Sequence, residues 1–231
     1  GVIILPPREG VVGTPRNLRL SCPAMKKLQV APGAVTPLRV MVVINSLTYG
    51  GAETQVVELA NSVDPAELDL HLCSLSAYVP QASRLRHPER LHILRKRGRF
   101  DLTVVPRLAR LLHSLRTDIV HGYLPDSEVV AALAGRMAGV RAVVGSERNS
   151  WYELRWIQRL AYWVTRSCFD RIVANSEAGA AFSRSARGYP QDHYRVVRNG
   201  VDTTRFRPVD GTAVRTSLGL TAAAPVIGMF A

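Results

Sequence analysis

A pair of glycines within residues 45–53 has the placement of an anion-binding turn. Gly50 and Gly51 lie between an apolar, strand-like run and a helical pattern. Glycines at this junction let the backbone approach a ligand closely, and the first turn of a helix offers free N–H groups to a phosphate. The segment lacks the GxGxxG spacing of dinucleotide sites, so an ordinary tight turn explains it equally well.

His121 ends another apolar run, where Gly122 leaves room beside the imidazole. A histidine in this place hydrogen-bonds a hydroxyl group or, when protonated, stabilises a phosphate. A structural histidine bonded to a neighbouring loop is the alternative, and it is the simpler interpretation of this residue taken by itself.

Polar residues also follow two later apolar runs. Glu147, Arg148 and Asn149 stand in the first of these loops, and Ser176 with Glu177 stands in the second. A serine followed by an acid is also the pattern of a helix N-terminus, where the hydroxyl accepts a backbone N–H and the acid faces the positive end of the helix dipole. We expect Ser176 to cap a helix, whatever else it does.

Strand-like and helix-like patterns alternate between these segments, which predicts an α/β fold: a Rossmann-like parallel sheet with helices on both faces. Ligands of such sheets bind at the carboxyl ends of the strands, so the loops described above should share one edge. The predicted strands are residues 38–44, 70–75, 91–94, 118–123, 142–145, 171–174 and 195–197, and the predicted helices are residues 52–63, 102–115, 127–138, 151–168 and 177–186.

The two ends of the sequence have a different character. Residues 1–37 contain six prolines and no sustained period, which predicts a disordered or extended segment, with Met25 as a candidate start. The last residues, 226–230, form an apolar, strand-like run, and a complete domain seldom ends in such a run. We therefore expect the sequence to be a fragment of a longer protein.

Composition narrows the class of protein. A chain that is 47% hydrophobic and 21% charged is globular, and it is neither collagen-like, nor a coiled coil, nor wholly disordered. No apolar run approaches the roughly 18 residues of a membrane span. The three cysteines are scattered without CxxC spacing, which argues against a disulfide scaffold and a zinc site and favours the reducing cytoplasm.

The charge is strongly basic, with 30 Lys and Arg against 18 Asp and Glu, although an Arg-rich composition explains part of the excess. Within residues 84–116 the acidic residues are Glu89 and Asp101 alone. The same stretch holds ten of the basic residues: Arg84, Arg86, Arg90, Arg95, Lys96, Arg97, Arg99, Arg107, Arg110 and Arg116. This excess suits an anionic membrane surface, a phosphorylated ligand or nucleic acid. Nucleic acid is disfavoured because only Phe100 offers a stacking ring there.

The predicted helix 151–168 interleaves aromatic and basic side chains, among them Trp151, Trp156 and Trp163. Helices of this type lie on anionic membrane surfaces. The alternative is that the aromatic face packs against the sheet while the arginines stay in water. The first reading would place the protein peripherally at the inner face of the membrane.

The most specific pattern comes near the end of the alternating region. Asn199, Gly200 and Asp202, followed by a Phe-x-Pro, resemble the interdomain hinge of family 4 glycosyltransferases of the GT-B fold. The Gly-Gly-Ala-Glu, Asp-Ile-Val-His and Ala-Asn-Ser-Glu segments fall in the order and spacing of that family. The resemblance covers residues 38–208, and the ordered set is far more specific than any one motif.

The resemblance implies two Rossmann-like domains that face each other across a cleft. Residues 38–208 would be the acceptor-side domain and residues 209–231 the truncated start of the donor-binding domain. The implied reaction is retaining transfer of a sugar from a nucleotide-sugar to a glycan or lipid-linked acceptor, with no metal and no cofactor beyond the nucleotide-sugar substrate.

The resemblance also implies roles for individual residues. Gly50 and Gly51 would approach the donor diphosphate, and His121 would be the catalytic residue that faces the transferred sugar or the acceptor. Glu147, Arg148 and Asn149 would line the acceptor side, while Asn199, Gly200 and Asp202 would form the hinge.

The part of the family that holds most of the donor falls beyond residue 231. The paired glutamates and the Arg and Lys that neutralise the leaving diphosphate belong to that part, and retaining transfer depends on stabilising this charge. We therefore expect this chain alone to be inactive. A non-catalytic sugar-phosphate-binding domain is the alternative function.

Overall fold

The computed structural model describes residues 37–98, 101–149, 153–221 and 224–226. The chain divides between Asn199 and Gly200 into two compact units. This division falls inside the segment that resembles an interdomain hinge. Each unit is described by itself below.

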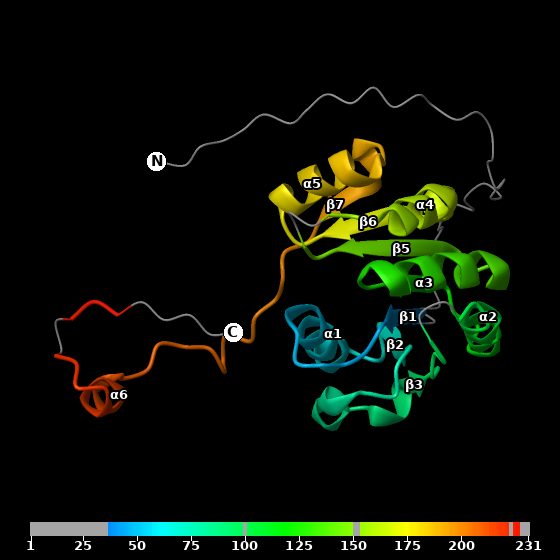
Figure 1. Cartoon of the computed structure of the whole chain (residues 1–231). Helices are drawn as coiled ribbons and strands as arrows, with labels where there is room; N and C mark the ends of the chain where they lie inside the picture. The colour runs from blue at the N-terminus through cyan, green and yellow to red at the C-terminus, as the bar shows by residue number, and fades with distance from the viewer. Residues whose placement is uncertain (1–36, 99–100, 150–152, 222–223, 227–231) are drawn as a thin grey trace. The chain divides into compact units, whose positions relative to one another are not determined.

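The first unit is built on one parallel sheet of seven strands, as the alternating pattern predicted (Figure 1). The strands are β1 (Leu38–Ile44), β2 (Leu68–Ser74), β3 (Leu91–Ile93), β4 (Ile119–Gly122), β5 (Ala142–Glu147), β6 (Arg171–Ala174) and β7 (Tyr194–Val196). Their order is β3-β2-β1-β4-β5-β6-β7. The order reverses between β1 and β4, so the loops after these two strands diverge and leave a crevice at the carboxyl edge, where ligands of open α/β sheets bind.

Helices cover both faces of the sheet: α1 (Gly51–Ser62), α2 (Val104–Ser114), α3 (Pro125–Ala138), α4 (Trp156–Thr165) and α5 (Glu177–Arg187). Alternate residues of β1 show the division, because successive strand side chains point to opposite faces. Val42 and Ile44 join one core together with residues of α1. Met41 and Val43 join the other core, to which α2, α3 and α5 contribute. The predicted arrangement is therefore confirmed.

Two predicted boundaries that bear on the site were wrong, while the other bounds agree with the prediction within two residues. The helix expected over residues 151–168 begins only at Trp156 and passes at Arg166 into a short 3₁₀ turn; Trp151 lies outside the described residues. Arg155 has an extended backbone, and its N–H donates to Gln158 Oε1 at 3.0 Å, which starts the helix there. Strand β5 runs on to Glu147, because pairing with β6 continues to the Glu147–Ala174 pair.

The junction of β4 with α3 is unusually tight. A side chain on Gly122 would bring its Cβ within 2.6 Å of the Glu128 Cα atom, so only glycine allows the helix to cross the strand end this closely. Leu124, between the strand and the helix, has φ 69°, a left-handed conformation that is strained for leucine. The tight junction places the first turn of α3 directly beside the end of β4.

The second unit contains one described helix, α6 (Thr212–Ser217). The strand expected over residues 226–230 lies outside the described residues except for Val226. The extended segment expected over residues 1–37 likewise lies outside them except for residue 37.

Candidate functional site

His121 is held by its neighbours at the carboxyl edge of the sheet. Its Nε2 lies 2.7 Å from the hydroxyl of Ser146 on the adjacent strand β5. Its ring lies 4.6 Å from the ring of Tyr123, centroid to centroid, at an interplanar angle of 47°. The imidazole therefore has one fixed orientation at the strand end beside the switch point between β1 and β4.

The imidazole of His121 is neutral at physiological pH. Burial and, to a smaller extent, the nearby positive charge of Arg148 lower its pKa to about 3, against the opposing effect of a hydrogen bond with the Gly145 backbone. The expectation that a protonated His121 stabilises a phosphate was therefore wrong. A neutral ring hydrogen-bonded to a hydroxyl group is what the structure shows.

We predict that His121 does not titrate between pH 5 and 8. Its pKa in the folded state lies below the ordinary histidine value of 6.5, so protonation favours the unfolded chain. The stability that neutral His121 contributes is fully present above pH 6.5 and is lost as the pH falls from there toward about 3. NMR of the imidazole resonances checks this, with a His121→Gln variant to assign the signal. A titration midpoint near 6.5 would contradict it.

Arg148 connects the site to the predicted hinge. Its guanidinium lies 4.6 Å from the centroid of the Tyr123 ring, and Nη2 donates to the Tyr123 hydroxyl at 2.9 Å. Nη1 donates to Asn199 Oδ1 at 3.0 Å. The buried Nε has no hydrogen-bond partner among the described residues. The sequence did not single out Tyr123, which joins Arg148 to His121.

The carboxylate of Glu147 joins a buried ion cluster, while its Oε1 also accepts the N–H of Asn149 at 3.2 Å. Its carboxylate lies 3.1 Å from Arg187 of α5, and Glu128 of α3 lies 3.0 Å from the same guanidinium. All three side chains are at most 2% exposed. Tyr162 of α4 donates its hydroxyl to Glu128 at 2.5 Å. The cluster thus joins α3, α4, α5 and β5.

The buried ion cluster is linked to His121 through Ser146. Glu128 Oε1 accepts the backbone N–H of Ser146 at 2.7 Å, and Ser146 carries the hydroxyl bonded to His121. Burial raises the pKa of Glu128. The positive charge of Arg187 lowers this pKa, and the negative charge of the Glu147 carboxylate raises it. Sequence reasoning missed Glu128 and Arg187, because a charged residue on a helix is ordinarily exposed.

Gly50 and Gly51 stand at the N-terminus of α1, as predicted, with Gly50 as the N-cap residue. The carboxylate of Glu53 folds back over this terminus: a Cβ on Gly50 would lie 2.3 Å from Glu53 Oε2. Thr48 donates its hydroxyl to the other carboxylate oxygen at 3.0 Å. Nothing lies within 4 Å of a Cβ built on Gly51, so the open approach to the helix N-terminus is at Gly51.

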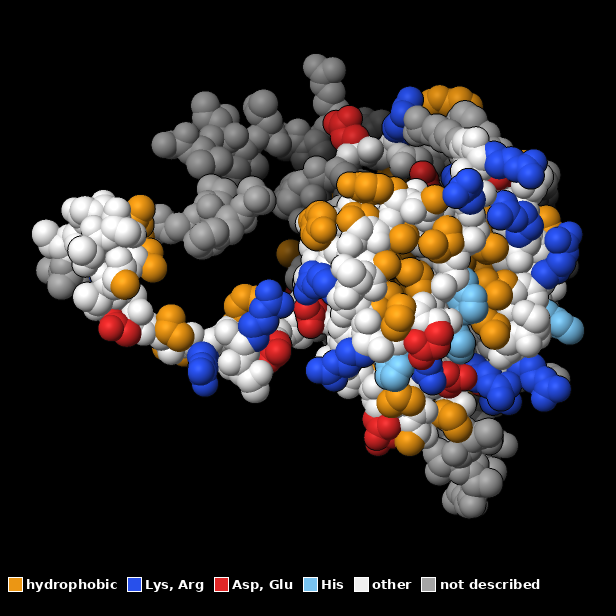
Figure 2. All heavy atoms as spheres, turned by 90° about the horizontal axis from the view of Figure 1, so that it is seen from below, with side chains coloured by type: hydrophobic (Ala, Val, Ile, Leu, Met, Phe, Trp, Pro, Cys, Tyr) orange, Lys and Arg blue, Asp and Glu red, His pale blue; other side chains and the backbone are white. Residues whose placement is uncertain are grey.

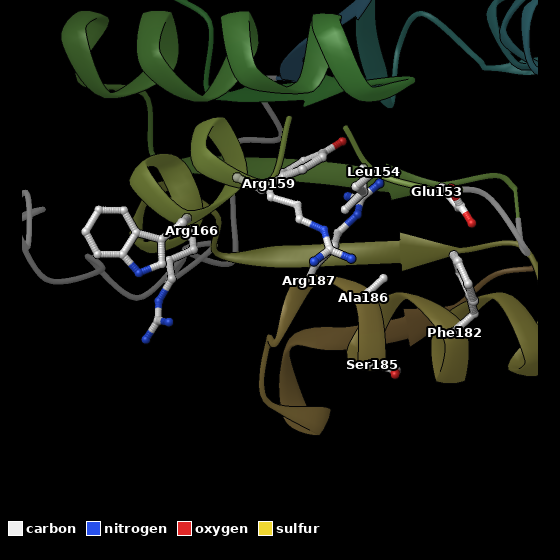
Figure 3. Close-up of a pocket in the computed structure, with 10 residues that line it drawn as sticks. Glu153, Leu154, Arg159, Arg166, Phe182, Ser185, Ala186 and Arg187 are labelled. Atoms are coloured by element: carbon white, nitrogen blue, oxygen red, sulfur yellow. The ribbon is translucent and has the colours of Figure 1, made fainter. Parts of the chain in front are cut away.

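Hollows surround the first turn of α4. One of about 190 Å³ is lined by Ser146, Glu147, Arg148 and Asn149, which brings the predicted acceptor-side residues together. A larger one of about 520 Å³ lies between α4 and α5, with Glu153 and Phe182 at one end and Arg166 at the other (Figure 3). The two hollows share Glu153, Leu154 and Arg187.

The basic stretch 84–116 is less one-sided than its composition indicated. Arg84 pairs with Glu58 at 2.6 Å and Arg90 pairs with Asp69 at 3.1 Å, and both acids come from outside the stretch. Figure 2 shows basic side chains grouped along one margin of a face and mixed with acidic ones elsewhere on it. The excess of positive charge on this stretch is therefore partly offset by acids from other elements. Arg99 lies outside the described residues.

Ser176 caps α5, since its hydroxyl accepts the N–H of Gly179 at 3.0 Å, as predicted. Cys73 and Cys168 are buried free thiols. In the part of the chain that the structure describes, no three side chains of His, Cys, Asp or Glu converge as a metal site requires. No helix in that part combines the length and the apolar character needed to cross a membrane.

A parallel sheet with its switch point between β1 and β4, and polar groups gathered at that edge, defines a Rossmann-like domain of the GT-B kind. The family named Glycosyltransferase Family 4 matches residues 49–205, so the chain belongs to that family. The matched segment contains every candidate residue from Gly50 to Asp202. A search of curated proteins found no match.

Solved structures share the fold. HepE of Anabaena, in complex with UDP and glucose, is 19% identical with a TM-score of 0.64, covering 79% of this chain and 50% of its own. A glycosyltransferase of Rickettsia africae is 15% identical with a TM-score of 0.62, covering 82% and 52%. The lipopolysaccharide outer core galactosyltransferase WaaB, in its apo form, is 16% identical with a TM-score of 0.52, covering 71% and 46%. The chain thus spans about half the length of these proteins.

Proposed function

We propose that this chain is the acceptor-side domain of a retaining glycosyltransferase, which moves a hexosyl or related group from a nucleotide-sugar to a glycan or lipid-linked acceptor. The observation that carries the proposal is the family match over residues 49–205, which contains the held imidazole of His121 and the Arg148–Asn199 bond. HepE, solved with UDP and glucose, supports a nucleotide-sugar as the donor. The reaction would need no metal and no other cofactor.

Each polar group at the carboxyl edge of the sheet has a binding role in this proposal. The open N–H groups at Gly51 approach the donor diphosphate, with Glu53 displaced from its place near Gly50. Neutral His121 hydrogen-bonds a hydroxyl of the transferred sugar. Arg148 and Asn149, which line the same hollow, orient the acceptor. Transfer also requires stabilisation of the leaving diphosphate, for which we expect a second domain to supply the cations.

The test of this function is sugar transfer by the whole gene product. The coding sequence on both sides of residues 1–231 is read, the product is expressed, and release of UDP or GDP from nucleotide-sugars is followed with candidate acceptors. Acceptor-dependent release with retained anomeric configuration supports the proposal. Tight binding of sugar phosphates without any transfer would favour a non-catalytic sugar-phosphate-binding domain.

We predict that the chain alone binds nucleotide-sugars weakly or not at all, because most donor contacts would belong to the second domain. Titration calorimetry of residues 25–231 with common UDP- and GDP-sugars checks this. Micromolar affinity would show that the described edge itself holds the donor, and would move the donor site into this domain.

We also propose that the protein is cytoplasmic and contacts the inner face of the membrane through α4. Four apolar side chains share one exposed side of this helix: Trp156 (76% exposed), Leu160 (50%), Trp163 (38%) and Val164 (36%). Arg155, Arg159 and Arg166 flank them and are exposed. An exposed apolar stripe bordered by arginines is the pattern of a helix that lies in an anionic interface.

The double variant Trp156→Ser/Leu160→Ser should co-sediment with anionic vesicles much less than the wild-type chain does, because it loses the apolar anchor while keeping every charge. Wild-type binding should weaken in 1 M salt, where the Debye length falls to about 3 Å. Met137→Ser is the matched control, since Met137 is an exposed apolar residue of α3 (65%). Equal pelleting of the double variant and the wild type would overturn the role of α4.

A further inference from the structure

An apolar groove runs between three helices beside the proposed acceptor site. It has a volume of about 270 Å³. Its apolar lining includes Leu102 just before α2, Val105 of α2, Val129 and Leu133 of α3, and Ile157 and Ala161 of α4; Asp101 and Gln158 add polar groups to it. Leu102 is 77% exposed, so an apolar side chain at the rim faces water when the groove is empty. Such a lining is suited to a hydrocarbon chain and offers little to a sugar.

A basic hollow adjoins this groove at the carboxyl edge of the sheet. It has a volume of about 420 Å³ and is lined by Asn45, Ser76, Arg95 and Lys96, among others. Lys96 and Asp126 line both the hollow and the groove, so the two meet at these residues. Together they have the size of a small-molecule site, which spans roughly 300–1,000 Å³.

The charges at the junction favour an anionic group. The ammonium of Lys96 and the guanidinium of Arg95 have no ion pair within the described part of the chain. Among the described residues, Asp126 is the one acid that lines the basic hollow, so the hollow carries a net positive charge. Asp101 lines the groove beside Lys96, where its carboxylate already accepts the N–H groups of Arg97 and Thr103. Asn45 and Ser76 add neutral polar groups for hydroxyls or phosphate oxygens.

We infer that the groove and the basic hollow form one binding site for an anionic amphiphile: a phosphate headgroup lies in the hollow at Arg95 and Lys96, and its single hydrocarbon chain lies in the groove between α2, α3 and α4. The use of this ligand as the sugar acceptor rests on the transferase function proposed above. Binding of the amphiphile does not depend on that transferase function. The site narrows the acceptor from any glycan to a lipid-linked phosphate.

The test uses monoalkyl phosphates of increasing chain length, each below its micelle concentration, titrated into residues 25–231 by calorimetry. Each methylene that enters the groove should tighten binding about fourfold, so octyl phosphate should bind roughly fifteen times more tightly than hexyl phosphate. Inorganic phosphate should bind far more weakly than either, and an octyl glucoside without charge should also bind weakly. An affinity that does not depend on chain length would overturn the inference.

Variants separate the two halves of the site. Ala161→Phe fills the groove and should abolish the chain-length dependence, and Val105→Phe does the same from α2 if the first variant fails to fold. Arg95→Ser/Lys96→Ser should weaken every alkyl phosphate by at least tenfold while leaving the dependence on chain length. Arg110→Ser is the matched control, because Arg110 is an exposed arginine of α2 that does not line the site. Unchanged binding in both kinds of variant would overturn the inference.

This experiment needs no donor, so it stands apart from the proposed function. Chain-length-dependent binding in a protein whose full product transfers no sugar would keep the amphiphile site and reject the transferase. Transfer to water-soluble glycans, with alkyl phosphates bound no better than inorganic phosphate, would keep the transferase and reject the amphiphile site.

Discussion

Replacing Arg187 by alanine should lower the free energy of unfolding by about 3–5 kcal/mol, which is the typical cost of removing one partner from a buried ion pair. Arg187 is 1% exposed and is the cation shared by Glu128 and Glu147. Without it, two buried carboxylates face each other with no counter-charge, and each must take up a proton or draw in water. Urea unfolding followed by circular dichroism measures the change.

Arg159→Ala is the matched control for this prediction. Arg159 is an exposed arginine of α4 at the neighbouring hollow, and it has no ion pair in the described part of the chain. Its removal should change stability by less than about 0.5 kcal/mol. A second variant, Arg187→Met with Glu128→Gln and Glu147→Gln, removes all three charges and should recover part of the loss. A stability of Arg187→Ala equal to that of the control would show that the buried ion cluster contributes nothing.

Replacing His121 by alanine should reduce kcat of the whole transferase by about 10²- to 10³-fold, which corresponds to roughly 2–4 kcal/mol of transition-state stabilisation. The ring lies at the end of β4 beside the switch point, and its neutral form is oriented by the hydroxyl of Ser146. Loss of the ring removes a donor or acceptor that is already in place when the sugar is transferred. The measurement compares kcat per folded molecule with the denaturant midpoint of the same variant.

Ser146→Ala separates orientation of the imidazole from its presence. This variant keeps the ring and removes its 2.7 Å partner, so kcat should fall by less than in His121→Ala. If His121→Ala shifts the denaturant midpoint and leaves kcat unchanged, His121 is a structural residue bonded to a neighbouring strand. A large loss of kcat at an unchanged midpoint confirms the catalytic assignment.

The two predictions are linked through one hydrogen bond. Glu128 accepts the N–H of Ser146 at 2.7 Å, so the ion cluster around Arg187 and the orientation of His121 share a strand residue. Conservative changes in the cluster, such as Arg187→Lys, should therefore affect kcat more than exposed substitutions of equal stability do. The cluster positions the site through Ser146, and two of its members, Glu147 and Arg187, also line the hollow of about 190 Å³.

The order of strands and helices was predictable from the sequence because it depends on local periodicity. Runs such as residues 38–44 and 171–174 match the observed strands at both ends. Ser176 as a helix cap and the placement of Gly50 and Gly51 at a helix start also follow from neighbouring residues alone. The family could be recognised for the same reason, since its motifs are short and come in a fixed order.

What only the tertiary structure decided is the state of the charged groups. The sequence placed Glu147 beside Arg148 and Asn149 as one polar loop, yet the strand continues through Glu147 and turns its carboxylate toward Arg187, which lies 40 residues further along the chain. The sequence indicated that His121 could carry a proton. In the structure, burial and the charge of Arg148, which lies over the Tyr123 ring, lower the pKa of His121. Periodicity reports which face of a strand or helix is apolar. Ionisation and ion pairing depend on distances between elements remote in sequence and on how far water is excluded, and packing alone sets both.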